Sequence, residues 1–350
     1  MTTIKFGTDG WRGVIAEDFT FCNVRRVSQA IADYISQLSV KGKKPEVIVG
    51  YDRRFLSEEY AKTVCEVLAA NNIKVFFTCK PAPTPAVTLV IKMKNLSGAI
   101  VITASHNPPR FNGIKFKTKE ATSADETVTK IIEKLITKAK PKSVDFNRAL
   151  SKNLIKMIDV DKDYINFIRN YIDINIIKKT RPNLLIDYMH GVGAGYIEKL
   201  LKSSGCKITA MRIEKDPLFG GVSPEPVPKN LKDFLNRAKV EKPDLAIALD
   251  GDSDRIAACG AEGEYLCSGQ IISLILLHLL EYRKFKGAVI KTISGTDLIG
   301  KIAKDFKLEL LETPVGFKHI SQFMLQNIGM KKEKKCFRSY HHLCLENVER

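Results

Sequence analysis

Residues 46–78, EVIVGYDRRFLSEEYAKTVCEVLAANNIKVFFT, indicate the fold class of this chain. Two apolar runs in it, Glu46–Gly50 and Lys74–Thr78, have the length and the β-branched or aromatic content of buried strands. Between them, Glu59–Ala70 places apolar side chains at i, i+3 and i+4 intervals, which predicts an amphipathic helix. A strand, a helix and a second strand in this order are typical of a βαβ unit and predict a mainly parallel sheet.

The same alternation of strand and helix patterns continues along the chain. Further strands are predicted at Gly98–Thr103, Asn183–Asp187, Lys207–Met211, Asp244–Leu249, Gly287–Ile293 and Leu308–Leu311. Further helices are predicted at Asn23–Leu38, Asp125–Ala139 and Ile271–Tyr282. Breaks in the pattern separate domains at 1–145, 150–258 and 259–328 from a basic tail at 329–350 that lacks it. We therefore expect an α/β chain of tandem domains, each with a mainly parallel mixed sheet.

Composition limits the class of protein further. Hydrophobic residues make up 44% of the 350 residues and charged residues 27%, which is ordinary for a globular protein. No apolar run approaches the roughly 20 residues of a membrane span, and the first residues lack a secretory pattern. The cysteines outside the tail are spread singly, which favours reduced thiols. We expect a cytoplasmic protein that does not enter a membrane; no feature indicates its oligomeric state.

The net charge of +17 raises nucleic acid as a partner. However, lysines such as Lys130, Lys134 and Lys138 recur on the polar side of a predicted helix, where they solvate a surface. Aromatic residues do not alternate with basic ones, as a stacking platform for bases requires. We therefore expect no nucleic-acid partner, and the same positive field favours an anionic small-molecule substrate.

The segment TASHNPP at 103–109 is the first candidate for chemistry. It follows an apolar strand, so Ser105 lies at the carboxyl end of that strand, where α/β sheets bind ligands. His106 beside it is a possible proton acceptor. Asn112-Gly113 favours a two-residue hairpin that would fold Lys115 back toward Ser105, and a lysine beside a reacting phosphate supplies charge or a proton. An ordinary turn with surface lysines explains these residues equally well.

The segment DGDSDR at 250–255 is the second candidate and follows the apolar strand Leu245–Leu249. Three carboxylates at alternate positions suit one hard cation and leave room for a phosphate oxygen as a further ligand. An EF-hand loop is excluded because Arg255 and Ala261 stand where that loop needs glycine and a carboxylate. A solvated acidic turn is the remaining alternative, which the buried strand leading into the segment disfavours.

Two further segments have residues that suit an anion. KFGTDGWRG at 5–13 surrounds Arg12 with glycines, and arginine is well suited to bidentate contact with phosphate. TPVGFKH at 313–319 places Lys318 and His319 at a predicted helix start. Each of these segments is by itself also explained as an ordinary turn.

Taken in order, these motifs resemble those of the α-D-phosphohexomutases, which include phosphoglucomutases, phosphomannomutases and phosphoglucosamine mutases. The resemblance covers about residues 4–325 and rests on GTDGWRG (7–13), TASHNP (103–108), NGIK (112–115) and DGDSDR (250–255). It implies tandem α/β/α domains, with a phosphoserine loop in domain I, a metal-binding loop in domain II and a partial domain III. The implied reaction interconverts hexose 1-phosphate and hexose 6-phosphate through a bisphosphate intermediate.

The resemblance also implies a role for each matching residue. Ser105 would be the phosphorylated nucleophile, and its phosphate would hold Mg²⁺ together with Asp250, Asp252 and Asp254. The candidate acid, base and charge-neutralising groups are His106, Lys115 and Arg12. The implied contacts to a phosphorylated hexose are Arg255, Lys318 and His319. Hexose 1,6-bisphosphate would act as the activator.

Two family segments are not found, Gly-Glu-x-Ser-Gly and Arg-x-Ser-Gly-Thr. We therefore expect an incomplete third domain, no fourth domain and inefficient turnover. Two other functions stay open: a haloacid-dehalogenase-type phosphatase with Asp250 as nucleophile, and a non-catalytic remnant that binds sugar phosphates.

Overall fold

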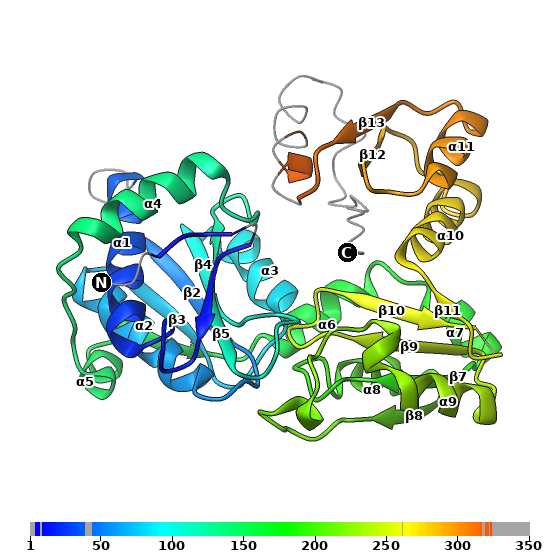
Figure 1. Ribbon diagram of the computed structural model, residues 1–350, viewed down its shortest axis with the longest axis horizontal. Coiled ribbons are helices and arrows are strands. Elements are labelled where there is room, and N and C mark those ends of the chain that lie inside the picture. Colours follow the sequence, from blue (N-terminus) through cyan, green and yellow to red (C-terminus); the bar gives the residue numbers. More distant parts are fainter. Residues whose placement is uncertain are drawn as a thin grey trace. The chain divides into compact units, whose positions relative to one another are not determined.

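Six strands form the first sheet of the computed structural model, in the order β1-β5-β4-β2-β3-β6 (Figure 1). The strands are β1 (Trp11–Val14), β2 (Glu46–Tyr51), β3 (Lys74–Thr78), β4 (Gly98–Ile102), β5 (Phe111–Thr118) and β6 (Ile155–Ile158). Strands β4, β2, β3 and β6 run parallel, while β5 is antiparallel to β4 and β1 is antiparallel to β5. The predicted mainly parallel mixed sheet is therefore confirmed.

The structure describes residues 4–7, 9–38, 44–260, 262–316, 319–321 and 323. They divide into two units, residues 1–264 and residues 265–350. The first unit holds the sheet above and a second sheet, and the second unit holds a pair of parallel strands. Lys318 and the tail at 329–350 lie outside the described residues.

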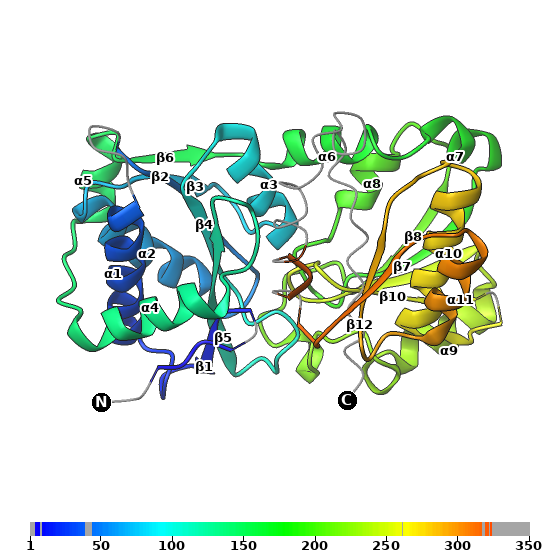
Figure 2. The ribbon, with the colours of Figure 1, turned by 90° about the horizontal axis from the view of Figure 1, so that it is seen from above.

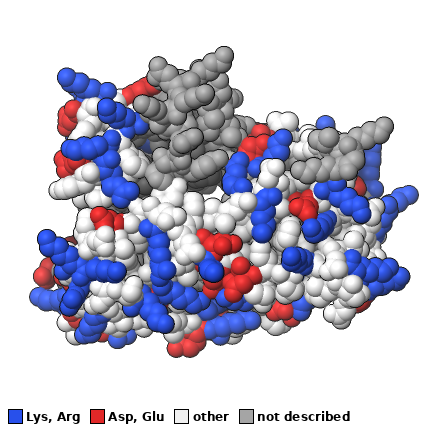
Figure 3. Space-filling view, turned by 180° about the vertical axis from the view of Figure 1, so that it is seen from behind, with Lys and Arg blue, Asp and Glu red and all other residues white. Residues whose placement is uncertain are grey.

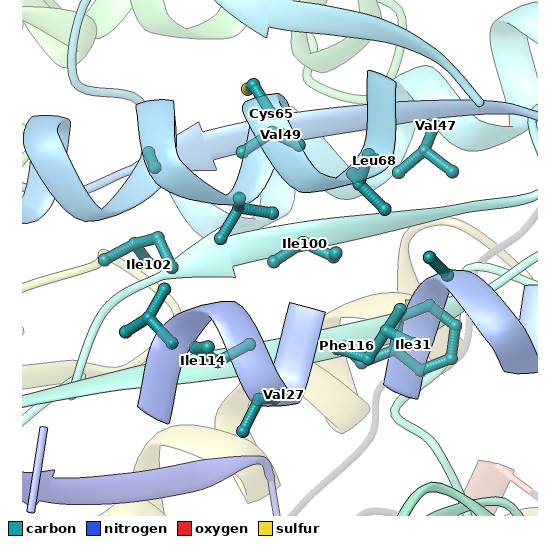
Figure 4. Packing of buried hydrophobic residues seen from close by; sticks show 14 of the residues in the cluster. Val27, Ile31, Val47, Val49, Cys65, Leu68, Ile100, Ile102, Ile114 and Phe116 are labelled. Carbon is teal, nitrogen blue, oxygen red and sulfur yellow. The ribbon is translucent and has the colours of Figure 1, made fainter. Parts of the chain in front are cut away.

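Helices cover both faces of the first sheet, as Figure 2 shows. One face packs against α1 (Phe21–Leu38), α2 (Ser57–Ala70), α4 (Glu126–Lys138) and α5 (Phe146–Ser151), and the other packs against α3 (Thr84–Lys94). Because successive strand side chains point to opposite faces, Val47 and Val49 join the first layer, which Figure 4 shows, while Ile48 joins the second. All three side chains are fully buried, and each burial contributes about 1.5–3 kcal/mol.

The predicted hairpin at Asn112-Gly113 is wrong, because both residues lie inside β5. They pair with Gly13 and Arg12 of β1. A Cβ at Gly113 would lie 2.6 Å from the Thr103 carbonyl oxygen and 2.7 Å from that of Trp11, so glycine is needed for close approach of neighbouring backbones rather than for a turn. The reversal of the chain instead occurs between β4 and β5, in the loop that carries Ser105.

The first sheet extends beyond the predicted end of the first domain at residue 145. Strand β6 pairs in parallel with β3 and completes the sheet at its edge. This strand has only four residues, and its second and third side chains are exposed, so its apolar pattern is weak in the sequence. Residues 139–145, which include the Pro141-Lys142-Ser143 break, have no helix or strand in the structure, and the predicted domain bounds stay a prediction.

A second sheet in the first unit positions the acidic segment. Its strands β10-β9-β7-β8 comprise β7 (Asn183–Asp187), β8 (Lys207–Met211), β9 (Leu245–Leu249) and β10 (Ile256–Cys259). Strands β7, β8 and β9 run parallel, and β10 is antiparallel to β9. The accompanying helices are α6 (Asp161–Arg169), α7 (Ile174–Thr180), α8 (Tyr196–Leu201), α9 (Lys232–Glu241) and the short η1 (Phe219–Gly221) and η2 (Pro228–Asn230). The acidic segment forms the turn from β9 to β10.

The second unit contains β11 (Tyr265–Leu266), α10 (Ser268–Glu281), β12 (Val289–Thr292), α11 (Asp297–Asp305) and β13 (Leu310–Thr313). Strands β12 and β13 pair in parallel, and α11, which connects them, was not predicted from the sequence. Leu276 and Leu280 of α10 pack with Ile299 and Ile302 of α11 in its core. Among the described helices of the chain, none has the length and apolar character needed to cross a membrane.

Basic side chains are spread over the face shown in Figure 3, among acidic and uncharged residues. Lys130 on α4, one of the lysines predicted to solvate a surface, has a side chain that is 66% exposed and pairs with Glu126 one helical turn away. An exposed pair of this kind contributes little to stability, because water screens it. The absence of a nucleic-acid partner stays a prediction.

Candidate functional site

Ser105 lies in the loop between β4 and β5 and is almost fully buried, with 1% of its surface exposed. Its backbone is in the left-handed region, with φ of 52°, which is unfavourable for a residue other than glycine. Its N–H donates to the Thr103 hydroxyl at 2.8 Å, and its Oγ donates to Oδ2 of Asp250 at 3.0 Å. The surrounding structure therefore holds this serine in a strained conformation with its hydroxyl toward the acidic turn.

The acidic turn places its three carboxylates together. One oxygen from each of Asp250, Asp252 and Asp254 lies within 4.8 Å of the others; the first two residues are buried and the third is exposed. Oδ1 of Asp250 accepts the backbone N–H groups of Asp254 and Arg255 at 3.0 and 3.1 Å, which fixes the turn. A Cβ at Gly251 would lie 2.6 Å from the Ser105 carbonyl oxygen, so this glycine allows the two loops to approach.

Lys115 extends from β5 into the centre of the acidic groups. Its Nζ lies 2.8 Å from Asp252, 2.7 Å from Asp254 and 2.9 Å from Asp9, and its side chain is 2% exposed. Burial alone would lower the pKa of Lys115, but these three carboxylates outweigh it and hold the pKa well above its usual value. Lys115 is therefore positively charged near pH 7.

His106 and Arg12 lie beside the serine loop. Nδ1 of His106 is 3.4 Å from Ser105 Oγ, and Arg12 on β1 donates to the Asn107 side chain at 2.5 Å. Burial, with the positive charges of Arg255, Arg12 and Lys115, lowers the pKa of His106 to about 3. The imidazole is therefore neutral near pH 7.

The remaining predicted site residues divide between the two units. Arg255 is half-buried at the end of the acidic turn. Its positive charge acts to lower the pKa of both His106 and Asp250. His319 belongs to the second unit, where its N–H donates to the Gly316 carbonyl at 2.9 Å. Lys318 lies outside the described residues. The first unit thus brings together eight of the ten predicted residues: Arg12, Ser105, His106, Lys115, Asp250, Asp252, Asp254 and Arg255.

Two further residues complete the site and were given no role from the sequence. Asp9 bridges Lys115 to Lys117, whose Nζ lies 2.8 Å from its Oδ1. Thr84, the first residue of α3, donates its hydroxyl to Oδ2 of Asp252 at 2.5 Å and its N–H to the Asp252 carbonyl at 3.0 Å. Its position after the carboxyl end of a parallel strand is a sequence signal that could have indicated it.

The acidic turn fits a divalent cation. Oδ1 of Asp252 is buried and has no hydrogen-bond partner among the described residues, although a buried carboxylate oxygen normally has one. Burial raises the pKa of Asp250 well above its usual value, and the charges of Asp254 and Asp252 raise it further. A cation among these oxygens would satisfy the unpaired atom and remove the repulsion. Clustered carboxylate oxygens are the ligands that Mg²⁺ or Ca²⁺ prefers.

Fold and site together define a class: tandem α/β/α proteins in which a strained serine faces a cation-competent acidic turn. Models of phosphoglucomutase/phosphomannomutase α/β/α domains I, II and III match residues 3–143, 162–263 and 268–347. The chain belongs to the phosphoglucomutase/phosphomannomutase family, the α-D-phosphohexomutases predicted from its motifs, and this is a family of isomerases.

Individual relatives agree with the family. A phosphoglucomutase/phosphomannomutase of Thermococcus kodakarensis is 31% identical over 327 residues, covering 93% of this chain and 70% of the relative. A phosphoglucosamine/phosphogalactosamine mutase of Sulfurisphaera tokodaii is 30% identical over 313 residues, covering 89% and 67%. A crystal structure from Thermus thermophilus that carries a phosphomannomutase name superposes with a TM-score of 0.85 at 30% identity, covering 93% of this chain and 72% of that one.

Proposed function

We propose that this chain transfers a phosphoryl group between Ser105 and the hydroxyl groups of a phosphorylated hexose, and so interconverts hexose 1-phosphate and hexose 6-phosphate. The observation that carries the proposal is the contact of Ser105 Oγ with Asp250 at 3.0 Å, beside a buried lysine. A phosphate on this oxygen would lie between the acidic turn and the positive charges of Lys115 and Arg12. Those charges stabilise a transferring phosphoryl group.

The transfer itself exchanges one bond for another. The bond from Ser105 Oγ to phosphorus breaks, the bond from the sugar oxygen to phosphorus forms, and the sugar hydroxyl gives up its proton. Neutral His106 is the proposed acceptor of that proton, and Lys115 is the proposed donor of the proton that the released Ser105 Oγ takes up. Arg12 and Arg255 neutralise the phosphate while it moves. The reverse transfer from the other position of the hexose bisphosphate returns phosphate to Ser105.

Asp250, Asp252 and Asp254 would hold Mg²⁺ together with an oxygen of the Ser105 phosphate. When bound, the ion would supply positive charge that offsets the charge of the phosphoryl group. Asp250 as an alternative nucleophile is less well supported. Its Oδ1 accepts two backbone N–H groups and its Oδ2 accepts the Ser105 hydroxyl, so both oxygens are already bound.

We predict that Thr84→Val weakens Mg²⁺ binding by roughly 10- to 100-fold, the usual effect of removing an outer-shell partner of a metal ligand. The Thr84 hydroxyl is one of two side-chain donors to Oδ2 of Asp252, and valine keeps the shape of threonine without this donor. Isothermal titration with Mg²⁺ measures the affinity. Thr88→Val, one turn further along α3, removes only a hydrogen bond to a helix carbonyl and serves as the control. Equal affinities in the two variants would contradict the prediction.

The proposal for the sugar is based on the names of the relatives. Their names include glucose, mannose and glucosamine or galactosamine phosphates, so we propose a hexose or hexosamine phosphate as substrate, with the hexose 1,6-bisphosphate as activator. We also propose a cytoplasmic location, in keeping with free thiols at the described cysteines.

The proposed function is tested by phosphorylation of the chain. The protein is incubated with Mg²⁺ and glucose 1,6-bisphosphate, and its peptides are mapped by mass spectrometry. A single phosphate on Ser105, removed again by glucose 6-phosphate, supports the proposal. Binding of the sugar phosphate without phosphorylation would instead identify a non-catalytic binding protein.

A further inference from the structure

Arg54 is a buried arginine, 2% exposed, in the loop between β2 and α2. Its two terminal nitrogens donate to four backbone carbonyls, three in the loop that carries Ser105 and one at the first residue of β5. One nitrogen reaches Ser105 and Asn107 at 2.7 Å each, and the other reaches Pro108 at 3.0 Å and Phe111 at 3.1 Å. The guanidinium group therefore holds the whole loop through its backbone and spans the turn from β4 into β5.

A second layer of contacts fixes Arg54 itself. Its Nε lies 3.2 Å from Oδ2 of Asp52, with both side chains fully buried. Oδ1 of Asp52 accepts hydrogen bonds from the backbone N–H of Arg54 at 3.0 Å and from the Ser57 hydroxyl at 2.6 Å. Ser57 in turn accepts from the Asn112 side chain of β5 at 2.9 Å. On the other side, the ring of Phe219 covers the guanidinium, with 4.9 Å between the ring centroid and the central carbon.

The burial of Arg54 and Asp52 is not explained by a gain in stability. A buried charged pair gains little net stability, because removing both charges from water offsets their attraction. The contacts of Arg54 indicate another effect. One of the four carbonyls that it binds belongs to Ser105, whose left-handed backbone conformation must be stabilised by surrounding residues. The Ser105 carbonyl, which accepts a hydrogen bond from Arg54, also lies close to Gly251 of the acidic turn. Arg54 thus sets the position of Ser105 relative to the acidic turn.

We propose that Arg54, anchored by Asp52, is a positioning residue for phosphoryl transfer at Ser105. The proposal rests on the function proposed above. Arg54 donates to loop carbonyls and not to the reacting hydroxyl, so it acts through the geometry of the loop. A displacement of the nucleophile by a fraction of an ångström slows the transfer step but leaves the groups that bind the sugar and the cation in place.

Arg54→Lys tests this role. Lysine keeps the charge but has one nitrogen with three donors, which does not span four carbonyls. We expect the rate of Ser105 phosphorylation at saturating glucose 1,6-bisphosphate to fall by roughly 100-fold, as misplacement of reacting groups predicts. The half-saturating concentration of the bisphosphate and the affinity for Mg²⁺ are expected to stay unchanged. Rapid-quench phosphorylation with mass-spectrometric detection measures the rate.

Arg212→Lys is the matched control. Arg212 also forms a two-nitrogen ion pair with a buried aspartate, Asp187, but in the second sheet. We expect it to lower the melting temperature as Arg54→Lys does, with a wild-type phosphorylation rate. A folded Arg54→Lys protein that is phosphorylated as fast as the wild type would overturn the role of Arg54. If the wild-type chain itself is not phosphorylated, the proposed function fails first and the role of Arg54 fails with it.

Asp52→Asn provides a second variant in case Arg54→Lys does not fold. It keeps the size of the side chain and the guanidinium group, and removes the charge that anchors Arg54. We expect a smaller loss of phosphorylation rate, on the order of tenfold, because the loop is held by an arginine that is less well fixed. A folded Asp52→Asn protein with an unchanged rate would count against the proposal in the same way.

Discussion

Replacing Ser105 with alanine is expected to abolish phosphorylation of the chain and, with it, any exchange of phosphate between the 1- and 6-positions of a hexose. Loss of a nucleophile costs roughly 10⁶-fold where it has been measured in hydrolases that use a serine. The expected residual signal is therefore at background. The variant is expected to fold, because alanine keeps the Cβ and the loop is held by four hydrogen bonds from Arg54, while the deleted hydroxyl contacts the side chains of Asp250 and His106. Phosphate incorporation from glucose 1,6-bisphosphate and the melting temperature measure both effects.

Ser28→Ala is the control for Ser105→Ala. Ser28 on α1 is also fully buried, and its hydroxyl donates to the Val24 carbonyl of the same helix. It is expected to retain full phosphorylation. Release of inorganic phosphate that survives in Ser105→Ala and disappears in Asp250→Asn would identify Asp250 as the nucleophile and make the chain a phosphatase.

Asp252→Asn is expected to remove Mg²⁺ binding and phosphorylation together. Its Oδ1 is the buried oxygen without a partner among the described residues, and its Oδ2 accepts from Lys115 and Thr84. An asparagine amide carries no charge. Its NH2 group is a donor, which would face either the proposed cation or the two donors Lys115 and Thr84. The loss of Mg²⁺ affinity is expected to exceed the roughly 10- to 100-fold that removal of an outer-shell partner causes. Isothermal titration with Mg²⁺ and the phosphorylation rate are the two measurements.

Asp254→Asn and Asp233→Asn complete this series. The Asp254 side chain is 29% exposed, so water screens its charge and its attraction for Mg²⁺ is weaker. A smaller loss of Mg²⁺ affinity is therefore expected for Asp254→Asn than for Asp252→Asn. Asp233 is an exposed residue of α9 outside the site, and its variant is expected to bind Mg²⁺ as the wild type does. Wild-type Mg²⁺ affinity in Asp252→Asn would show that the acidic turn does not hold the ion.

The local pattern of the sequence determined the fold class and most of the strands. Lys74–Thr78, Asn183–Asp187 and Lys207–Met211 were predicted with the bounds that the structure has. Buried strands and amphipathic helices are encoded by residues close together in the chain, so their periodicity is visible without a structure. The weakly patterned edge strand β6 and the role of Asn112-Gly113 were not predictable in this way, because each depends on a neighbouring strand rather than on its own residues.

The motifs also predicted which residues carry the proposed chemistry, since Ser105, the three aspartates and Lys115 belong to short segments of characteristic composition. Only the tertiary structure decided how they are held. Arg54 reaches Ser105 from 51 positions away, Thr84 reaches Asp252 from 168, and Ser105 reaches Asp250 from 145. A buried donor must find its acceptor wherever the packed chain places one, and no local pattern specifies a partner at that separation.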